Sequence, residues 1–362
     1  MYPQVDGTVS SEITLEELQL AARNHALPLE ALRYPITPLG LHYLLIHFDI
    51  PSVDERAWRL TVGGSVEREL TLSLDELKAL PSRTQAVTLE CAGNGRALLA
   101  PRVLSQPWLH EAVGTAEWTG TPLGPILEEA GVLPAASEVV FTGLDRGVQK
   151  DVEHAYERSL PLAEAMRGDL LLAYAVNGEP LPPQHGFPLR LVVPGWYGMT
   201  HVKWLESITV VDEPFEGWQQ AVAYHLRESE DEQGTPVTRM LPRSLMVPPG
   251  IPDFLSRDRF VPAGACLLEG RAWSGWGRIT QVEVSTDGGR TWDEAEVGEP
   301  LSDHAWLGWT YTWNAEPGEH EVCCRASDAT GRMQPLAPVW NFDGYCNTAV
   351  QRMRVVVRGP AP

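Results

Sequence analysis

Positive charge is scarce in this sequence, because 28 Lys and Arg residues stand against 48 Asp and Glu residues over 362 positions. The resulting formal net charge of −20 would repel nucleic acid and anionic lipid, so we expect neither as a partner. An acidic surface could attract a cationic protein, although solubility is the ordinary explanation for it. If the substrate is an anion, the positive charge that binds it must be concentrated in one place.

Cysteines and long apolar segments are also sparse. Five cysteines in 362 residues do not form a disulfide framework, and the absence of a C-x-x-C pair argues against a structural zinc site. No run reaches about 18 apolar residues, which argues against a membrane-spanning helix. The N-terminal residues lack the basic and apolar regions of a signal peptide, so the expected location is the cytoplasm.

Helix and strand signals mix without a regular βαβ rhythm in the first two thirds of the chain, which predicts an α+β fold. Capping signals predict short helices that begin after Thr14, Ser73, Thr121 and Pro161. Apolar runs predict buried strands over residues 139–144, 170–176, 189–193 and 207–211. Beyond residue 238 only short strands follow, a texture typical of an immunoglobulin-like β-sandwich. We therefore predict one domain over residues 1–237 and a sandwich over residues 238–362.

The segment Thr88–Arg96 (TLECAGNGR) carries the most chemistry. A strand leads Cys91 into a turn of small residues and two glycines, which exposes a thiol and lets a bulky group approach the backbone. Arg96 would lower the pKa of the thiol and favour the thiolate, the form that binds soft metals. From the spacing alone, an ordinary buried cysteine is the favoured interpretation. A nucleophile is a third, and it needs a basic histidine that the sequence cannot locate.

TLECAGNGR resembles the molybdenum-ligating segment of the sulfite oxidase family, and further segments follow in family order. They are Arg23–His25, Gly143–Arg146, Ala155–Tyr156 with Pro161, Leu172–Gly178, His185–Arg190, His201–Leu205, Ala272–Arg278 and Ser285–Trp292. The last two resemble the family's dimerisation domain, and the resemblance runs through nearly the whole chain. It implies a molybdopterin-binding first domain, Cys91 as the thiolate ligand of the metal, and a homodimer.

The resemblance also implies where cofactor and substrate bind. The phosphate of a pyranopterin needs a buried counter-charge, and the residues assigned to the cofactor are Asn24, His25, Asp145, His185, Arg190, His201 and Lys203. The catalytic residues assigned beside Cys91 are Arg23, Arg96, Trp108, Tyr156 and Arg278. Taken singly, each has an ordinary structural explanation, such as a core histidine, a turn aspartate or a surface arginine.

The implied function is the oxidation of sulfite to sulfate by oxygen-atom transfer, with a molybdenum–molybdopterin cofactor and no heme. Electrons would pass to an external acceptor, such as a cytochrome, another small carrier or oxygen. Two departures leave the substrate open, because Leu104 stands where eukaryotic members often place a lysine and Gly95 where a second arginine can occur. Two rival functions remain: the same scaffold acting on nitrate or an S-oxide, and a non-catalytic binding or assembly protein.

Overall fold

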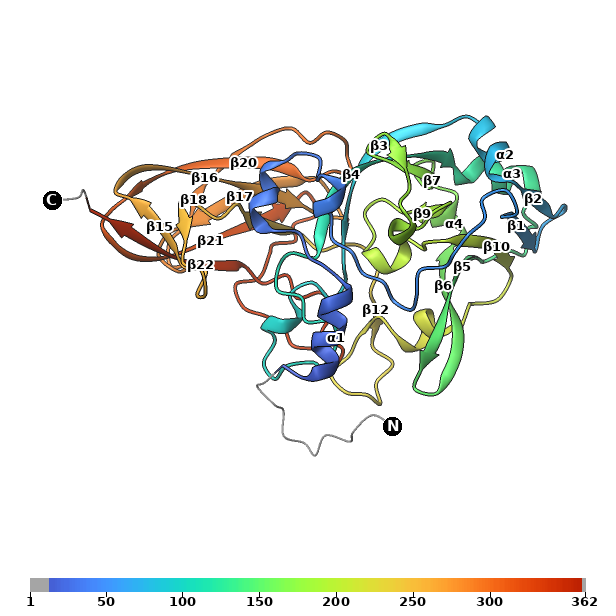
Figure 1. Cartoon of the computed structure of the whole chain (residues 1–362), viewed down its shortest axis with the longest axis horizontal. Coiled ribbons are helices and arrows are strands. Elements are labelled where there is room, and N and C mark those ends of the chain that lie inside the picture. The colour runs from blue at the N-terminus through green and yellow to red at the C-terminus, as the bar shows by residue number, and fades with distance from the viewer. Residues whose placement is uncertain (1–12, 360–362) are drawn as a thin grey trace.

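The structure, a computed structural model, describes residues 13–359. Its strands gather into two lobes along the long axis of the molecule (Figure 1). Strands of the first two thirds of the chain form the lobe on the right of Figure 1, and those of the last third form the lobe on the left. Strands hold far more of the described residues than helices do, so helices contribute less than the α+β expectation suggests.

The first lobe is built on two sheets. One has the order β2-β1-β10-β5-β6, with only β1 and β10 parallel. Its strands are β1 (Leu60–Gly64), β2 (Leu70–Leu72), β5 (Glu138–Gln149), β6 (Val152–Pro161) and β10 (Leu205–Val211). The other has the order β3-β4-β7-β8 with β9 also paired to β7, and consists of β3 (Arg83–Glu90), β4 (Val113–Pro122), β7 (Leu171–Val176), β8 (Glu179–Pro180) and β9 (Arg190–Val192). A short hairpin is formed by β11 (His225–Leu226) and β12 (Thr235–Pro236).

Four α-helices lie within residues 13–359, namely α1 (Leu15–Arg23), α2 (Leu74–Ala79), α3 (Leu123–Ala130) and α4 (Leu162–Ala165). Thr14 and Ser73 cap α1 and α2 in complete capping boxes, as predicted. The predicted cap of α3 is wrong, because Pro122 occupies the N-cap and Thr121 still belongs to β4, where its hydroxyl donates to the carbonyl of Leu77. No helix among these residues is long and apolar enough to cross a membrane.

The second lobe consists of two sheets that face each other. One has the order β13-β16-β20-β19 and the other β14-β15-β22-β21-β17-β18. Their strands are β13 (Arg243–Met246), β14 (Ile251–Pro252), β15 (Arg259–Pro262), β16 (Gly264–Trp273), β17 (Ile279–Ser285), β18 (Asp293–Glu294), β19 (Glu296–Val297), β20 (Leu307–Ala315), β21 (Gly318–Asp328) and β22 (Gln351–Arg358). Leu268 and Trp309 of the first sheet share one core with Val282, Val322 and Val355 of the second. This shared core holds the two layers together, because burial of apolar surface is the main favourable term.

The two lobes are joined at the end of β3, directly before Cys91. Glu90, the last residue of β3, is fully buried and pairs with Arg243 of β13 at 2.8 Å. The other carboxylate oxygen of Glu90 accepts a hydrogen bond from the indole of Trp273 in β16 at 2.8 Å. A separate apolar cluster, including Leu32 and Tyr197, also packs against Trp273. The second lobe therefore fixes the backbone that presents Cys91.

Candidate active site

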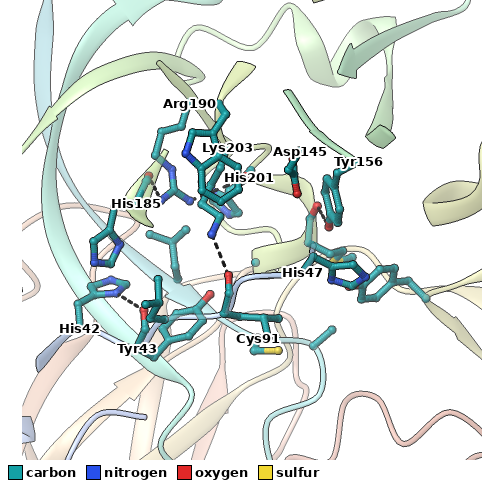
Figure 2. A pocket seen from close by; sticks show the side chains of 18 residues that line it. His42, Tyr43, His47, Cys91, Asp145, Tyr156, His185, Arg190, His201 and Lys203 are labelled. Carbon is teal, nitrogen blue, oxygen red and sulfur yellow. Dashed lines mark hydrogen bonds between the residues drawn. The ribbon is translucent and has the colours of Figure 1, made fainter. Parts of the chain in front are cut away.

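A cavity lies beside the end of β3. Its walls come from segments far apart in the sequence, namely residues 42–45 and His47, Leu89, Cys91 and Ala92, Asp145, Tyr156, His185, Arg190, residues 198–199, His201, residues 203–204 and Tyr224. Figure 2 shows Cys91 on one side of this cavity and Arg190, His201 and Lys203 on the other.

The turn after β3 fits the glycines of its sequence. A Cβ on Gly93 would lie 2.6 Å from Nη1 of Arg96, so only glycine lets the guanidinium come so close. Gly95 has φ +91°, and a Cβ there would lie 2.5 Å from the carbonyl oxygen of Asn347. Asn94 closes the turn, because its amide group donates to Glu90 at 3.0 Å and its backbone N–H donates to the carbonyl of Cys91 at 3.0 Å. The residues 88–96 thus form a rigid support for one thiol.

Cys91 is a free cysteine whose side chain is buried yet lines the cavity. Burial raises the pKa of its thiol, while the Arg96 charge, the Gly93 backbone N–H and the Trp108 side chain oppose that rise. Arg96 lowers the pKa of the thiol, as the sequence analysis expected, but the loss of hydration on burial raises that pKa by more. A metal cation at the sulfur would supply the charge that favours the thiolate.

Arg96 is held in place on the second lobe's side of the turn. Its Nε donates to the carbonyl of Asp343 at 3.1 Å and its Nη1 donates to the hydroxyl of Ser105 at 3.1 Å. The guanidinium lies over the ring of Tyr345, 5.0 Å from its centroid. The loop that contains Asp343 and Tyr345 is therefore the part of the second lobe that reaches the cysteine turn.

Two cations line the wall opposite Cys91. Arg190 is buried over the ring of Trp118 at 4.5 Å and donates to the carbonyl of His185 at 3.0 Å. Lys203 donates to the carbonyls of Leu45 at 2.8 Å and Gln184 at 3.2 Å. Burial lowers the pKa of Arg190 to about 10, and burial together with the Arg190 charge lowers the pKa of Lys203 to about 7. An anion placed here would be stabilised by both.

The histidines around the cavity are neutral at neutral pH. Burial lowers the pKa of His42 and His47 to about 4, of His201 to about 3 and of His185 to about 2. Of these four, the sequence analysis assigned only His185 and His201 to the cofactor, as donors when charged. A phosphate in the cavity would raise these pKa values, because an anion stabilises the protonated ring.

Asp145 lies beside Lys203 on the same wall (Figure 2). Burial raises the pKa of its carboxyl group to about 6, which the Lys203 charge partly opposes. Asp145 can therefore accept a hydrogen bond from a heterocyclic N–H or, when protonated, donate one.

Three residues assigned to the cofactor from the sequence are placed differently. His201 uses both ring nitrogens within the protein, accepting from the N–H of Val193 and contacting the carbonyl of Trp196. The Asn24 side chain is engaged with Leu20, Gln106 and Ile46, and neither Asn24 nor His25 lines the cavity. His25 is exposed and pairs its backbone with that of Leu44.

The residues assigned to catalysis are only partly brought together. Tyr156 lines the cavity and donates to the carbonyl of Met199 at 2.7 Å, and burial raises the pKa of its phenol, which therefore keeps its proton. Trp108 is buried next to the Cys91 thiol. Arg23 is exposed and donates to the carbonyl of Phe48. Arg278, which the sequence analysis placed beside Cys91, lies in the segment between β16 and β17. It is 58 % exposed, pairs with Glu299 at 2.5 Å and lies outside the lining of the cavity.

Four further cavity residues were missed by the sequence analysis: His42, Tyr43, His47 and Tyr224. Two histidines within the apolar segment Leu41–Phe48 are a signal that could have been used, because buried polar rings in an apolar run need a partner. Tyr224 has φ +61°, a strained backbone conformation that no sequence pattern predicts.

A molybdopterin group fits the residues present. Among residues 13–359, the Nε of Arg190, the Nε2 of His42 and the Nε1 of Trp108 are buried polar atoms with no hydrogen-bond partner. Such groups are costly unless a ligand satisfies them. Their chemistry, donors and cations on one wall with a soft thiol on the other, suits an anionic organic group that carries a soft metal.

The lowered pKa of Lys203, in the cavity wall opposite Cys91, can be tested in cofactor-free protein. Its folded pKa of about 7 lies below the value of 10.5 in an unfolded chain, so above pH 7 only the unfolded state keeps the proton. We expect the free energy of unfolding to rise between about pH 7 and 8.5, with a slope of up to about 1.4 kcal/mol per pH unit from this group. Urea unfolding should show that rise in the wild type and a smaller one in Lys203→Met; equal slopes would contradict the assignment.

Comparisons with known proteins agree with this site. An "Oxidoreductase molybdopterin binding domain" model matches residues 47–219, and a "Mo-co oxidoreductase dimerisation domain" model matches residues 243–358. The chain is 37% identical over 345 residues to mouse (Mus musculus) mitochondrial sulfite oxidase, covering 89% of this chain and 62% of that protein's length. It is 32% identical over 345 residues to sulfite oxidase of Arabidopsis thaliana, covering 88% and 87%. The crystal structure of the sulfane dehydrogenase SoxCD from Paracoccus pantotrophus superimposes with a TM-score of 0.79 at 29% identity, covering 91% and 83% of the two chains.

The fold and site thus define a molybdopterin-dependent oxidoreductase. The chain belongs to the sulfite oxidase family of molybdenum-cofactor enzymes. Membership favours an enzyme over the rival interpretation of a non-catalytic binding protein.

Proposed function

We propose that this protein oxidises sulfite to sulfate at a molybdenum centre whose protein ligand is Cys91. The observation that carries the proposal is one cavity with the Cys91 thiol on one wall and two cations, the buried Arg190 and the half-buried Lys203, on the other. The names of the mouse and Arabidopsis relatives support sulfite as the substrate.

The opposite wall would hold the molybdopterin. Arg190 and Lys203 offer cationic donors to its phosphate, while His185 and Asp145 offer polar groups to the phosphate and the heterocycle. When bound, the group supplies the two-electron redox chemistry and oxygen-atom transfer. For His201 we propose a supporting role, since its ring fixes the backbone of Val193 and Trp196 beside Arg190. Asn24 and His25 would act indirectly. Asn24 accepts a hydrogen bond from the N–H of Ile46 and His25 pairs its backbone with Leu44, so both would hold the cavity-lining segment in place.

The Cys91 side of the cavity would bind the substrate anion. Arg96 contributes a fixed positive charge next to the thiol. Arg23 contributes a second positive charge, which helps to lower the pKa of His47. Tyr156 is a neutral phenol that can donate a hydrogen bond to an oxyanion once it leaves the carbonyl of Met199. Trp108 packs against the thiol and excludes water from it. The structure does not support the same role for Arg278.

Several further features belong to the proposal. The first domain would span residues 1–237 and the second residues 238–362, with the two facing sheets of the second forming an immunoglobulin-like sandwich. Two such domains would associate in a homodimer, in keeping with the dimerisation-domain match. No heme is part of the proposal, so electrons would leave to an external acceptor such as a cytochrome, another carrier or oxygen. The cytoplasmic location stays a prediction.

The decisive experiment pairs metal analysis with an activity assay. Protein from a cofactor-competent host should contain molybdenum and pterin in equal amounts, and should reduce an artificial electron acceptor when sulfite is added. Nitrate and a sulfoxide are the comparison substrates with a reduced donor dye. Turnover of either of these without any sulfite-dependent reduction would overturn sulfite oxidation in favour of a reductase on the same scaffold.

A further inference from the structure

A buried arginine that the sequence analysis did not consider stands behind the substrate side of the cavity. Arg158 lies in β6, two residues after Tyr156, and its exposed fraction is 3%. Residues two apart in a strand share one face of the sheet, so Arg158 follows Tyr156 on the face that turns toward the cavity. No carboxylate within residues 13–359 pairs with it at salt-bridge distance.

The surroundings of Arg158 are aromatic and polar. Its Nη1 donates to the carbonyl of Gln219, and its Cζ lies 5.7 Å from the centroid of the Tyr224 ring. Its Nε is buried without a hydrogen-bond partner among the described residues. Tyr156 and Tyr224 both line the cavity, so they separate the guanidinium from the space beside Cys91.

A buried cation without a paired carboxylate is costly, because burial removes its hydration and no carboxylate at salt-bridge distance replaces it. Burial accordingly lowers the pKa of Arg158, while Tyr156, Tyr224, Tyr345 and the more distant carboxylate of Glu138 stabilise the charged form. A guanidinium nevertheless keeps its proton at neutral pH. Its positive potential acts across the two tyrosine rings, since charges in a poorly solvated interior are weakly screened.

We propose that Arg158 is a positioning residue for an oxyanion. Its charge, which lies behind Tyr156 and Tyr224 and has no salt-bridge partner among the described residues, makes the Cys91 side of the cavity selective for anionic substrates. It supplies the third positive charge that the sequence analysis assigned to Arg278. Arg158 acts through the tyrosines, by favouring an anion that accepts hydrogen bonds from their hydroxyl groups. The inference rests on the proposed function in one respect, namely that the substrate is a small oxyanion.

The alternative is a purely structural role. Through Gln219, Arg158 also fixes the helical turn Trp218–Val222, which packs against β6. A matched pair of variants separates the two roles, because Arg158→Lys and Arg158→Gln can both donate to the Gln219 carbonyl but only lysine keeps the charge.

The test measures sulfate binding to holoenzyme by equilibrium dialysis, and KM and kcat for sulfite alongside it. We expect Arg158→Gln to raise the dissociation constant of sulfate and the KM for sulfite by about tenfold, with a smaller change in kcat. Arg158→Lys should stay within about threefold of the wild type. Arg68→Gln removes the same charge from an exposed pair with Glu129 and should change neither constant.

Each outcome bears on the inference. Equal sulfate binding by the lysine and glutamine variants overturns it, and so does wild-type protein that binds no sulfate. If Arg158→Gln loses its molybdenum, Arg158→Met provides a second neutral variant; loss of folding in both, with Arg158→Lys intact and binding sulfate normally, would show a structural role and also overturn it. A wild type that binds sulfate but does not oxidise sulfite would overturn the proposed function alone.

Discussion

Cys91→Ser is expected to lower sulfite turnover by at least about a thousandfold while the protein keeps much of its pterin. A serine hydroxyl is a harder and far less acidic ligand than a thiol, so it cannot replace a thiolate on a soft metal. The pterin should be retained because Arg190 and Lys203, on the opposite wall, are untouched by the change. Steady-state dye reduction and pterin fluorescence after extraction measure the two quantities.

The control for this variant is Cys266→Ser. Cys266 is a free, half-buried cysteine of β16 in the second lobe, outside the lining of the cavity. Its substitution should leave turnover within about twofold of the wild type, as for a conservative change away from the site. Undiminished turnover in Cys91→Ser would refute the ligand role.

Arg243→Met is expected to lower the free energy of unfolding by about 3–5 kcal/mol. Arg243 is 1% exposed and pairs with the fully buried Glu90, which directly precedes Cys91. Its removal leaves a buried carboxylate without its counter-charge, and that penalty exceeds the loss of an exposed ion pair by several-fold. Urea unfolding of cofactor-free protein gives the value.

The double variant Glu90→Gln/Arg243→Met shows whether the cost comes from the charge left behind. It should be more stable than the sum of its two single variants predicts, since neither partner is then an unpaired ion. Arg68→Met, which breaks an exposed pair with Glu129, should cost less than about 1 kcal/mol. An Arg243→Met protein as stable as Arg68→Met would contradict the role of this pair in joining the lobes.

Local signals were sufficient where local geometry decides the structure. The Thr14 and Ser73 capping boxes and the small-residue turn after Cys91 depend on neighbours in sequence, and each is found as expected. The burial of the strand before Cys91 depends on distant residues instead. Residues 86–90 are all buried, because the backbone around His304 and Trp306 covers the second face of β3.

Long-range placement could not be predicted in the same way. A motif identified Arg278, but only the packing of the second lobe decides that this arginine faces outward and pairs with Glu299. The loop with Asp343 and Tyr345 reaches Arg96 instead, across a sequence separation that no local pattern reports. His42 and Arg158 are similar cases, since their burial beside the cavity depends on which strands and loops meet there.

X-ray absorption at the molybdenum edge tests the ligand role of Cys91 most directly. If the Cys91 thiolate binds the metal, wild-type protein will show one more sulfur neighbour of molybdenum than Cys91→Ser, and Cys266→Ser will match the wild type. An identical number of sulfur neighbours in the wild type and Cys91→Ser would contradict the assignment, whatever the activity of either protein.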